Sequence, residues 1–266
     1  MRHISELTPS QAAGVRYILS DIDDTLTRHG KLLASSYTAI WKLKEAGLKV
    51  IPVTGRPAGW CDCIVREWPV DGIIGENGAL AMWEEALAED VSGLPSLSAM
   101  YHPNALRNDH PILRSVREQA LKEIPGLRDA KDQFARLFDI ALDFAEEEPV
   151  LPLSAAKKVL EIASSQGAIA KISSIHINVW MGKYDKLSMA EQFLIERFGW
   201  QGDVSELIFI GDSPNDEPMF RRFPLSCAVA NIRRYQGIIQ HEPAFVSEQE
   251  CADGFAEIAE TLLAKR

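Results

Sequence analysis

The chain has 266 residues, which is enough for one large domain or two modest ones. With 46% hydrophobic and 25% charged residues, its composition is that of an ordinary globular protein. The formal net charge of −10 argues against non-specific binding to nucleic acid or to anionic membranes. It does not exclude a small anionic substrate, because such a ligand responds to the local field of its cleft.

The four cysteines, Cys61, Cys63, Cys227 and Cys251, do not form a zinc-binding pattern, because no second pair or histidine cluster accompanies the first two. We expect them to be reduced and mostly structural, as in a cytosolic protein. The amino-terminal residues lack the apolar stretch of a signal peptide, and no apolar run is long enough for a membrane span. The sequence therefore predicts a cytoplasmic protein without nucleic-acid or membrane partners.

The first expected strand ends in a cluster of acids. Residues 1–14 are polar and mixed, and we expect a loose lead-in there; residues 15–21 then form a buried strand. Asp21, Asp23 and Asp24 follow at its end, where they cannot be buried unpaired. Two close carboxylates repel each other unless a cation lies between them, and Mg²⁺ suits such oxygen ligands. An acidic turn without a metal remains the alternative.

Alternating helices and strands follow, with turn signals between them. Ser35 or Ser36 is the expected N-cap of a helix that Gly47 ends, and Asn77-Gly78 predicts a tight hairpin turn. Pro52 is unusual, because proline cannot donate a hydrogen bond in a central strand. We expect a loop at 27–34, a helix at 37–46, a strand at 48–53, a helix at 57–67, a strand at 71–75 and a hairpin strand at 80–83.

The pattern changes at about residue 86. The prolines and glycine within 89–111 predict a linker and loop, and the acidic run Glu146-Glu147-Glu148-Pro149 predicts a solvated turn. The segments between and after them repeat a helix-strand-strand order, which indicates a separate small α+β unit. We expect a helix at 112–124, a strand at 134–144, a helix at 155–166, and strands at 168–173 and 175–180.

The first pattern resumes at Lys186. A helix at 186–198 and a strand at 207–210 lead to Gly211-Asp212-Ser213-Pro214-Asn215-Asp216, and short strands at 225–230 and 244–246 precede a helix at 255–263. This alternation predicts an α/β fold with a doubly wound parallel sheet. We expect residues 1–85 and 186–266 to form the sheet domain and residues 86–185 to be inserted into it.

Polar residues that follow the strand ends are expected to meet at the carboxyl edge of this sheet. Each has a structural alternative: Thr54 could cap a helix, Lys186 could be a surface lysine, and Asp212 could be a loop acid. Each alternative is as good as the functional interpretation when the residue is taken alone. Their occurrence together, in this order along one sheet, favours a site.

Four motifs together resemble those of the haloacid dehalogenase superfamily of phosphotransferases. The matching segments are Asp21-Ile22-Asp23-Asp24-Thr25-Leu26, Val53-Thr54-Gly55-Arg56, Tyr184-Asp185-Lys186 and Gly211-Asp212-Ser213-Pro214-Asn215-Asp216. With Glu76-Asn77-Gly78-Ala79, the insertion resembles the type IIB capped branch, which includes Cof-type, sucrose-phosphate, trehalose-phosphate and mannosyl-3-phosphoglycerate phosphatases. The resemblance implies a Rossmann-like core with a C2B-type αββαββ cap. Asp24 departs from the family pattern, in which glycine is commonest, although asparagine or aspartate also occurs.

The resemblance also implies a role for each residue. Asp21 would be the nucleophile and Asp23 the general acid and base. Mg²⁺ would be held by Asp21, the backbone carbonyl of Asp23 and Asp212, with Asp216 orienting the metal waters. The residues implied for phosphate and substrate binding are Thr54, Gly55, Arg56, Asn77, Lys186 and Asn215.

The resulting expectation is a Mg²⁺-dependent phosphatase that acts on a small phosphorylated metabolite, with a sugar phosphate favoured. A phosphomutase and a non-catalytic protein that binds phosphorylated ligands are the alternatives. The candidate contacts from the inserted unit to the leaving group are Arg107, Arg136, His176 and Asn178. For His176 a structural role is the more common interpretation of a lone histidine at such a position.

Overall fold

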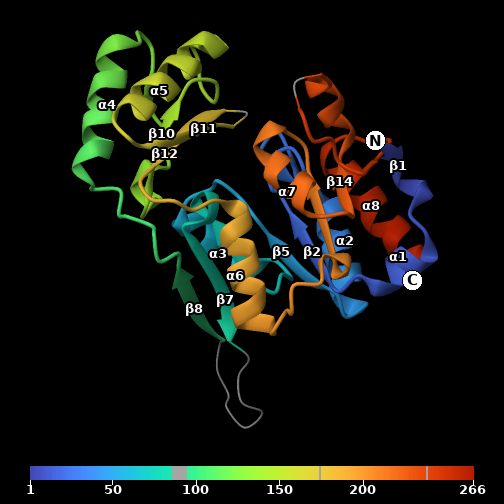
Figure 1. Ribbon diagram of the computed structural model, residues 1–266. Coiled ribbons are helices and arrows are strands. Elements are labelled where there is room, and N and C mark those ends of the chain that lie inside the picture. The colour runs from blue at the N-terminus through green and yellow to red at the C-terminus, as the bar shows by residue number, and fades with distance from the viewer. Residues whose placement is uncertain (86–94, 174, 238) are drawn as a thin grey trace.

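The computed structural model describes residues 1–85, 95–173, 175–237 and 239–266. A six-stranded parallel sheet forms the core, in the order β1-β15-β14-β13-β2-β5 (Figure 1). The predicted doubly wound α/β fold is therefore confirmed. Its strands are β1 (Arg2–His3), β2 (Tyr17–Ser20), β5 (Lys49–Pro52), β13 (Leu207–Gly211), β14 (Ser226–Ala228) and β15 (Phe245–Val246).

Helices cover both faces of this sheet. Successive side chains of a strand point to opposite faces, so Ile18 and Leu19 enter different cores. Ile18 lies in the core that includes α2 (Ala34–Glu45) and α8 (Cys251–Lys265), and Leu19 in the core that includes α6 (Lys186–Phe198) and α7 (Glu217–Arg222). Both faces of β2 are consequently buried, as expected for a central parallel strand.

The amino-terminal residues belong to the fold, so the loose lead-in predicted for them is wrong. β1 pairs with β15, and Ile4 and Leu7 are fully buried. Helix α1 (Pro9–Gly14) begins with a capping box, in which the Thr8 side chain accepts from the Gln11 N–H and the Gln11 side chain accepts from the Thr8 N–H. The two apolar residues were too few for a pattern to reveal this segment.

Pro52 fits the sheet because of the direction of its nitrogen. The N–H of Val53 donates to Ser20 in β2, so the nitrogen of Pro52 faces the other side. There β5 meets β6 (Ile73–Gly75) through a single bridge between Val53 and Ile74. No ladder hydrogen bond between described strands is lost at Pro52.

The loop predicted at 27–34 is a small hairpin, formed by β3 (Thr27–Arg28) and β4 (Lys31–Leu32). Helix α2 then starts after Leu33 without a side-chain cap, so the predicted N-cap is also wrong. The hydroxyl groups of Ser35 and Ser36 instead donate to Asp253 and Ala252 of α8. Tertiary contacts have taken the place of the expected cap.

Part of the predicted linker is a strand. The Asn77-Gly78 turn joins β6 to β7 (Leu80–Glu85), as predicted, and β8 (Ser96–Tyr101) adds to the other side of β7. The linker was predicted from prolines and glycine in the sequence, which did not indicate pairing with β7. Its residues at 89–94 lie outside the described part of the chain.

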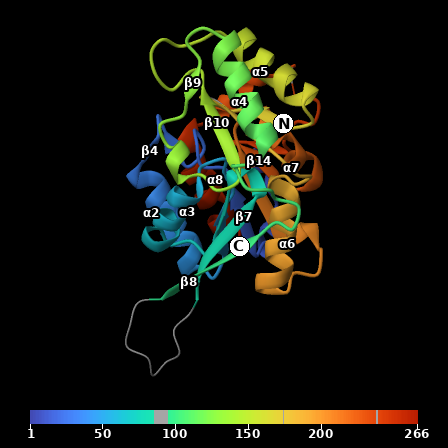
Figure 2. The ribbon, with the colours of Figure 1, turned by 90° about the vertical axis from the view of Figure 1, so that its left-hand side faces the viewer.

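The inserted unit, which we define as residues 111–180, has the predicted αββαββ order. Its antiparallel sheet has the order β11-β12-β10-β9. The apolar face of this sheet packs against α4 and α5, which lie on the side away from the core (Figures 1 and 2). The elements are α4 (Pro111–Glu123), β9 (Arg128–Asp129), β10 (Asp139–Asp143), α5 (Leu153–Ser165), β11 (Ile169–Ile172) and β12 (His176–Trp180).

The strand predicted at 134–144 is shorter than expected, because Gln133–Ala135 form a 3₁₀ turn before β10. The other face of the inserted sheet carries polar residues such as Asp139, His176 and Asn178. Helix α3 (Ala58–Glu67) approaches the inserted unit so closely that a Cβ on Gly59 would lie 2.9 Å from that of Ala135. Among the described helices, none has the length and apolar character needed to cross a membrane.

Candidate active site

Three adjacent strands of the core deliver the motif residues to one edge of the sheet. β13, β2 and β5 are neighbours, and Asp212, Asp21 and Thr54 follow their carboxyl ends. Lys186 is the first residue of α6, far along the chain from Asp21. The structure brings Asp21, Asp212 and Lys186 into one buried cluster.

Lys186 bridges two of the acids. Its Nζ lies 2.5 Å from Asp21 Oδ1 and 3.1 Å from Asp216 Oδ1. A cation is unfavourable at a helix N-terminus, where the helix dipole is positive. The two carboxylates offset this cost and hold the ammonium beside Asp21.

The acids outnumber the cation. Ligand atoms of Asp21, Asp212 and Asp216 lie within 4.8 Å of one another. Burial raises the pKa of Asp21 to about 7 despite the nearby Lys186, and burial together with Asp216 raises the pKa of Asp212 well above its usual value. Three carboxylates around one ammonium leave an excess of negative charge, and oxygen donors of this kind fit a hard divalent cation such as Mg²⁺.

The loop after β13 is folded around Asp216. Its Oδ2 accepts hydrogen bonds from the N–H groups of Asp212 and Ser213. Gly211 is needed here, because a Cβ at this position would lie 2.4 Å from Asp216 Oδ2. Asp216 therefore fixes the backbone that carries Asp212.

Asn231, in the 3₁₀ helix Ala230–Tyr235, is a residue that the sequence did not single out. Its Nδ2 donates to Asp212 Oδ2 (3.1 Å) and to the carbonyl of Asp24 (2.9 Å). Asp24 has a positive φ of 58°, which explains why glycine suits this position and why aspartate is tolerated. No local pattern marks Asn231, because its partners are remote in sequence.

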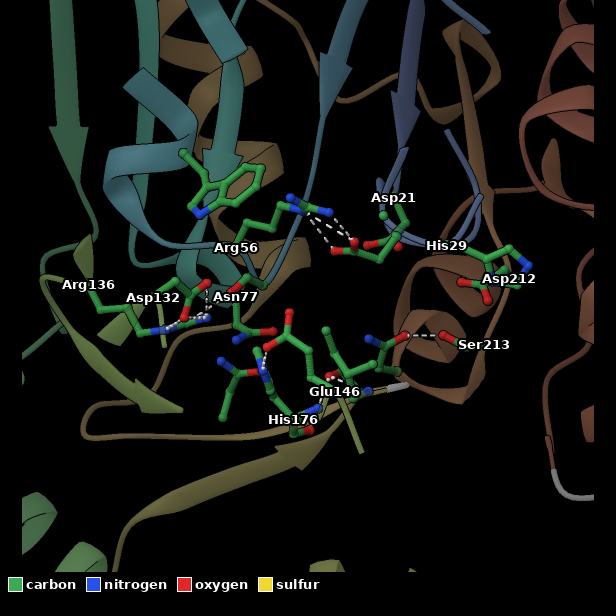
Figure 3. A pocket seen from close by; sticks show the side chains of 18 of the residues that line it. Asp21, His29, Arg56, Asn77, Asp132, Arg136, Glu146, His176, Asp212 and Ser213 are labelled. Atoms are coloured by element: carbon green, nitrogen blue, oxygen red, sulfur yellow. Dashed lines mark hydrogen bonds and ion pairs between the residues drawn. The ribbon is translucent and has the colours of Figure 1, made fainter. Parts of the chain in front are cut away.

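Asp23 is bound by Arg56 in this structure. The guanidinium donates to both carboxylate oxygens, with Arg56 Nη2 2.6 Å from Asp23 Oδ1 (Figure 3). The same guanidinium lies over the ring of Trp60, 4.4 Å from its centroid. Arg56, predicted as a substrate contact, therefore lies at the pocket wall and pairs with a predicted catalytic acid.

The remaining predicted residues lie around this centre. Thr54 is fully buried, and its hydroxyl accepts from the N–H of Arg56. Gly55, Asn77 and Asn215 line the adjoining pocket, and Asn215 Oδ1 accepts from the hydroxyl of Ser213.

A pocket of about 310 Å³ lies between the core and the inserted unit. Asp21, Asp23 and Asp212 line it from the core, and Arg136, His176 and Asn178 line it from the inserted unit (Figure 3). Arg107 is not among its described lining residues; its guanidinium lies over Phe138 instead. Sequence reasoning missed several lining residues: His29, Gly30, Lys31, Trp60, Asp132, Glu146, Ser173, Ile175 and Ser213.

Glu146 has a role that the sequence did not indicate. It belongs to the acidic run, which forms an exposed turn as predicted. Glu146 also lines the pocket, and its Oε2 lies 2.7 Å from His176 Nε2. What the run could not show was that the turn faces the core.

Glu76 joins the core to the inserted unit. Its fully buried carboxylate accepts hydrogen bonds from four backbone N–H groups: Ala58 in the core, and Leu137, Phe138 and Asp139 in the inserted unit. Burial and Asp139 raise the pKa of Glu76 to about 7, although the N–H donors oppose this. Sequence reasoning placed Glu76 only in a turn motif and missed this role.

Arg136 also connects the core to the inserted unit. We call this set of contacts, made by Glu76 and Arg136, the joint. Its Nη1 donates to Asp139 Oδ1 (2.9 Å) and to the carbonyl of Gly55 (3.1 Å), and its side chain also pairs with Asp132. Asn178 donates to Asp139 Oδ2. Arg136, predicted as a leaving-group contact, is therefore largely occupied by residues of the protein itself.

Comparisons with known proteins agree with this fold. A protein of Thermoplasma acidophilum gives a TM-score of 0.70 at 19% identity, covering 94% of this chain and 98% of that chain. A subclass IIB sugar phosphatase of the superfamily gives 0.63 at 15% identity, with coverage of 94% and 98%. The sucrose-phosphatase of Synechocystis, solved with sucrose and phosphate, gives 0.61 at 14% identity, with coverage of 93% and 97%.

No curated protein matches the sequence. The model of the haloacid dehalogenase-like hydrolase family, however, matches residues 18–108 and 96–258, which together span most of the chain. These segments contain all four motifs. The chain therefore belongs to the haloacid dehalogenase-like hydrolases.

Proposed function

We propose that this protein is a Mg²⁺-dependent phosphatase that hydrolyses a small phosphorylated metabolite, most suitably a sugar phosphate, through an aspartyl-phosphate on Asp21. The observation that carries the proposal is the buried Asp21 carboxylate, held by Lys186 beside Asp212 at the wall of a pocket. The family match and the sugar-phosphatase neighbours support it.

Asp21 is placed to act as the nucleophile. Lys186 binds only Oδ1, and no described residue makes a hydrogen bond to Oδ2. In the proposed first step, Oδ2 attacks phosphorus and the bond from phosphorus to the leaving oxygen breaks. Lys186 favours the charged form of the attacking group and attracts the negatively charged phosphoryl oxygens.

Asp23 acts as the acid and then as the base. It protonates the leaving oxygen in the first step; in the second, it takes a proton from the water that attacks phosphorus and releases phosphate from Asp21. In this structure the guanidinium of Arg56 occupies both carboxylate oxygens of Asp23. We infer that Arg56 releases Asp23 when substrate enters and turns toward the substrate, which makes its predicted role as a substrate contact compatible with the geometry.

The cluster of Asp21, Asp212 and Asp216 supports a metal role for Asp21 and Asp212, and Asp216 fixes the loop that carries Asp212. The carbonyl of Asp23 remains a proposed third ligand. Bound Mg²⁺ would neutralise negative charge on the phosphoryl oxygens. Thr54, Gly55, Asn77 and Asn215 remain the proposed phosphate and substrate contacts.

We assign residues 1–85 and 186–266 to a catalytic domain and residues 86–185 to a cap that selects the leaving group. The joint at Glu76 and the polar face of the inserted sheet support this division. We also propose that the protein works in the cytosol, because all four cysteines are free.

Replacement of the nucleophile tests the proposal. Asp21→Asn should lower phosphate release on the order of 10⁴-fold or more, and EDTA should abolish release by the wild type until Mg²⁺ is added. Asp62→Asn, at the surface of α3, is the matched control and should retain activity. Wild-type turnover by Asp21→Asn would exclude this mechanism.

A further inference from the structure

A second cavity adjoins the active-site pocket. It has a volume of about 440 Å³ and lies between β11 of the inserted unit and α7 of the core. Asn215 lines both cavities, so the two lie next to each other at the loop that carries Asp212. A leaving group that extends from Asp21 past Asn215 would reach this space, which we call the side cavity.

The side cavity has the opposite charge balance to the active site. Lys171 and Arg221 line it, and neither makes an ion pair or hydrogen bond with another described residue. Glu217 is its one described acid, and the Glu217 carboxylate already accepts from the N–H groups of Gln240 and His241 and contacts the His241 ring. In a chain with a net charge of −10, the side cavity therefore holds a partly buried lysine and an exposed arginine that pair with no described acid.

Lys171 is the residue that ties the side cavity to the reaction centre. It lies on β11 directly opposite Asn178 of β12, and paired residues of neighbouring strands share one face of a sheet. Asn178 lines the active-site pocket, so Lys171 also faces the core. Burial lowers the pKa of Lys171, and Asp185 and Asp216 oppose this only from beyond ion-pair distance.

A partly buried ammonium without a counter-charge is costly. An anionic ligand in the side cavity would offset this cost for Lys171. Apolar side chains also line the cavity and are available to the carbon atoms of such a ligand: Leu160, Ile172, Pro214 and Pro218.

We propose that Lys171 and Arg221 form a second anion subsite, which binds a carboxylate or phosphate at the far end of the substrate's leaving group. The inference rests on the proposed function, since it concerns the group that leaves from the phosphoryl transferred to Asp21. It narrows the substrate class to phosphomonoesters that carry a second anionic group.

Three ligands with the same six-carbon chain test the subsite. Sorbitol 6-phosphate has an uncharged far end, 6-phosphogluconate carries a carboxylate there, and sorbitol 1,6-bisphosphate carries a phosphate. Their dissociation constants would be measured by calorimetry with Asp21→Asn and Mg²⁺, and kcat/KM with the wild type. We expect one or both charged ligands to be preferred by about 10- to 100-fold, as for a hydrogen bond to a charged group.

Variants assign the preference to Lys171. In the Asp21→Asn background, Lys171→Met should abolish the ratio of charged to uncharged affinity, whereas Lys157→Met, an exposed lysine of α5, should retain it. A preference for only one charged ligand identifies the group that is bound. Equal binding of all three ligands, binding of none, or a ratio unchanged by Lys171→Met overturns the subsite. Because binding does not need turnover, this result is separate from a failure of the proposed phosphatase reaction, which would appear as no phosphate release by the wild type.

Discussion

Two buried groups of carboxylates, one at the joint and one at the catalytic edge, are built in opposite ways. At the joint, each oxygen of Glu76 accepts two backbone N–H donors, which the fold itself supplies. At the catalytic edge, one ammonium, that of Lys186, faces three carboxylates and pairs with Asp21 and Asp216. Both groups are buried, yet at the catalytic edge negative charge remains in excess and Oδ2 of Asp21 has no described hydrogen-bond donor.

This difference in hydrogen bonding indicates that the first group serves stability and the second serves function. A buried carboxylate with a full set of donors holds two parts of the chain together. A buried carboxylate without them costs stability, and proteins retain such groups where a ligand or a reaction needs them. The joint should therefore respond to substitution by loss of stability, and the catalytic edge by loss of activity.

The largest expected effect is at the catalytic edge. Asp212→Asn should lower Mg²⁺-dependent phosphate release on the order of 10³-fold, because a proposed metal ligand is lost. The melting temperature of the Asp212→Asn variant, measured without metal, should not be lower than that of the wild type. The new amide oxygen can still accept from Asn231, its NH₂ group can donate to the hydroxyl oxygen of Thr25, and one of three like charges is removed. A clear drop in melting temperature would show that Asp212 is structural and would break the comparison.

The next effect is at the joint. Glu76→Gln turns an NH₂ group toward two backbone N–H donors, so the free energy of unfolding at pH 8 should fall by about 2–4 kcal/mol. Denaturant titration measures this fall, and Glu45→Gln, at the surface of α2, is the control. A variant as stable as the wild type would mean that the four hydrogen bonds do not hold the inserted unit.

The last expected effect is a dependence of the free energy of unfolding on pH, to which both groups of carboxylates contribute. The pKa values of Asp21 and Glu76 rise to about 7 on folding, from ordinary values of 3.8 and 4.5. A carboxyl group with a raised pKa binds a proton on folding, so its contribution is present at low pH and is lost as the pH rises toward 7.

Without divalent cations, the free energy of unfolding should therefore decrease between pH 4.5 and pH 7. Mg²⁺ should reduce the part that comes from Asp21, and Glu76→Gln should remove a separate part. Denaturant titrations at several pH values would measure both. A stability that increases over this range would contradict the raised pKa values.

The sequence predicted the core of this protein well, because its signals are local. Apolar strands run directly into motif residues such as Asp21 and Asp212, and helices alternate with them at short spacing. The elements that were missed have weak local signals. β1 and β8 are identified by pairing with distant strands, and the β3–β4 hairpin is only four paired residues.

The same distinction holds for the site. Asp21 and Lys186 were predicted as neighbours from their motifs, and they lie in contact. The second partners of these residues were not predictable. Asn231, which binds Asp212, and Glu146, which binds His176, carry no pattern of their own, and their roles arise only when remote segments meet.

The turn Glu76-Asn77-Gly78 has a consequence for how this enzyme family can diversify. Glu76 binds the inserted unit, Asn77 lines the pocket, and a Cβ on Gly78 would lie 2.1 Å from the carbonyl of Asp185, next to Lys186. Three adjacent residues thus each meet a separate demand, and a substitution at any one disturbs a different part of the enzyme. Amino-acid substitutions should accordingly accumulate slowly in this tripeptide during evolution. They should accumulate faster on the core-facing side of the inserted sheet, where they change the substrate contacts.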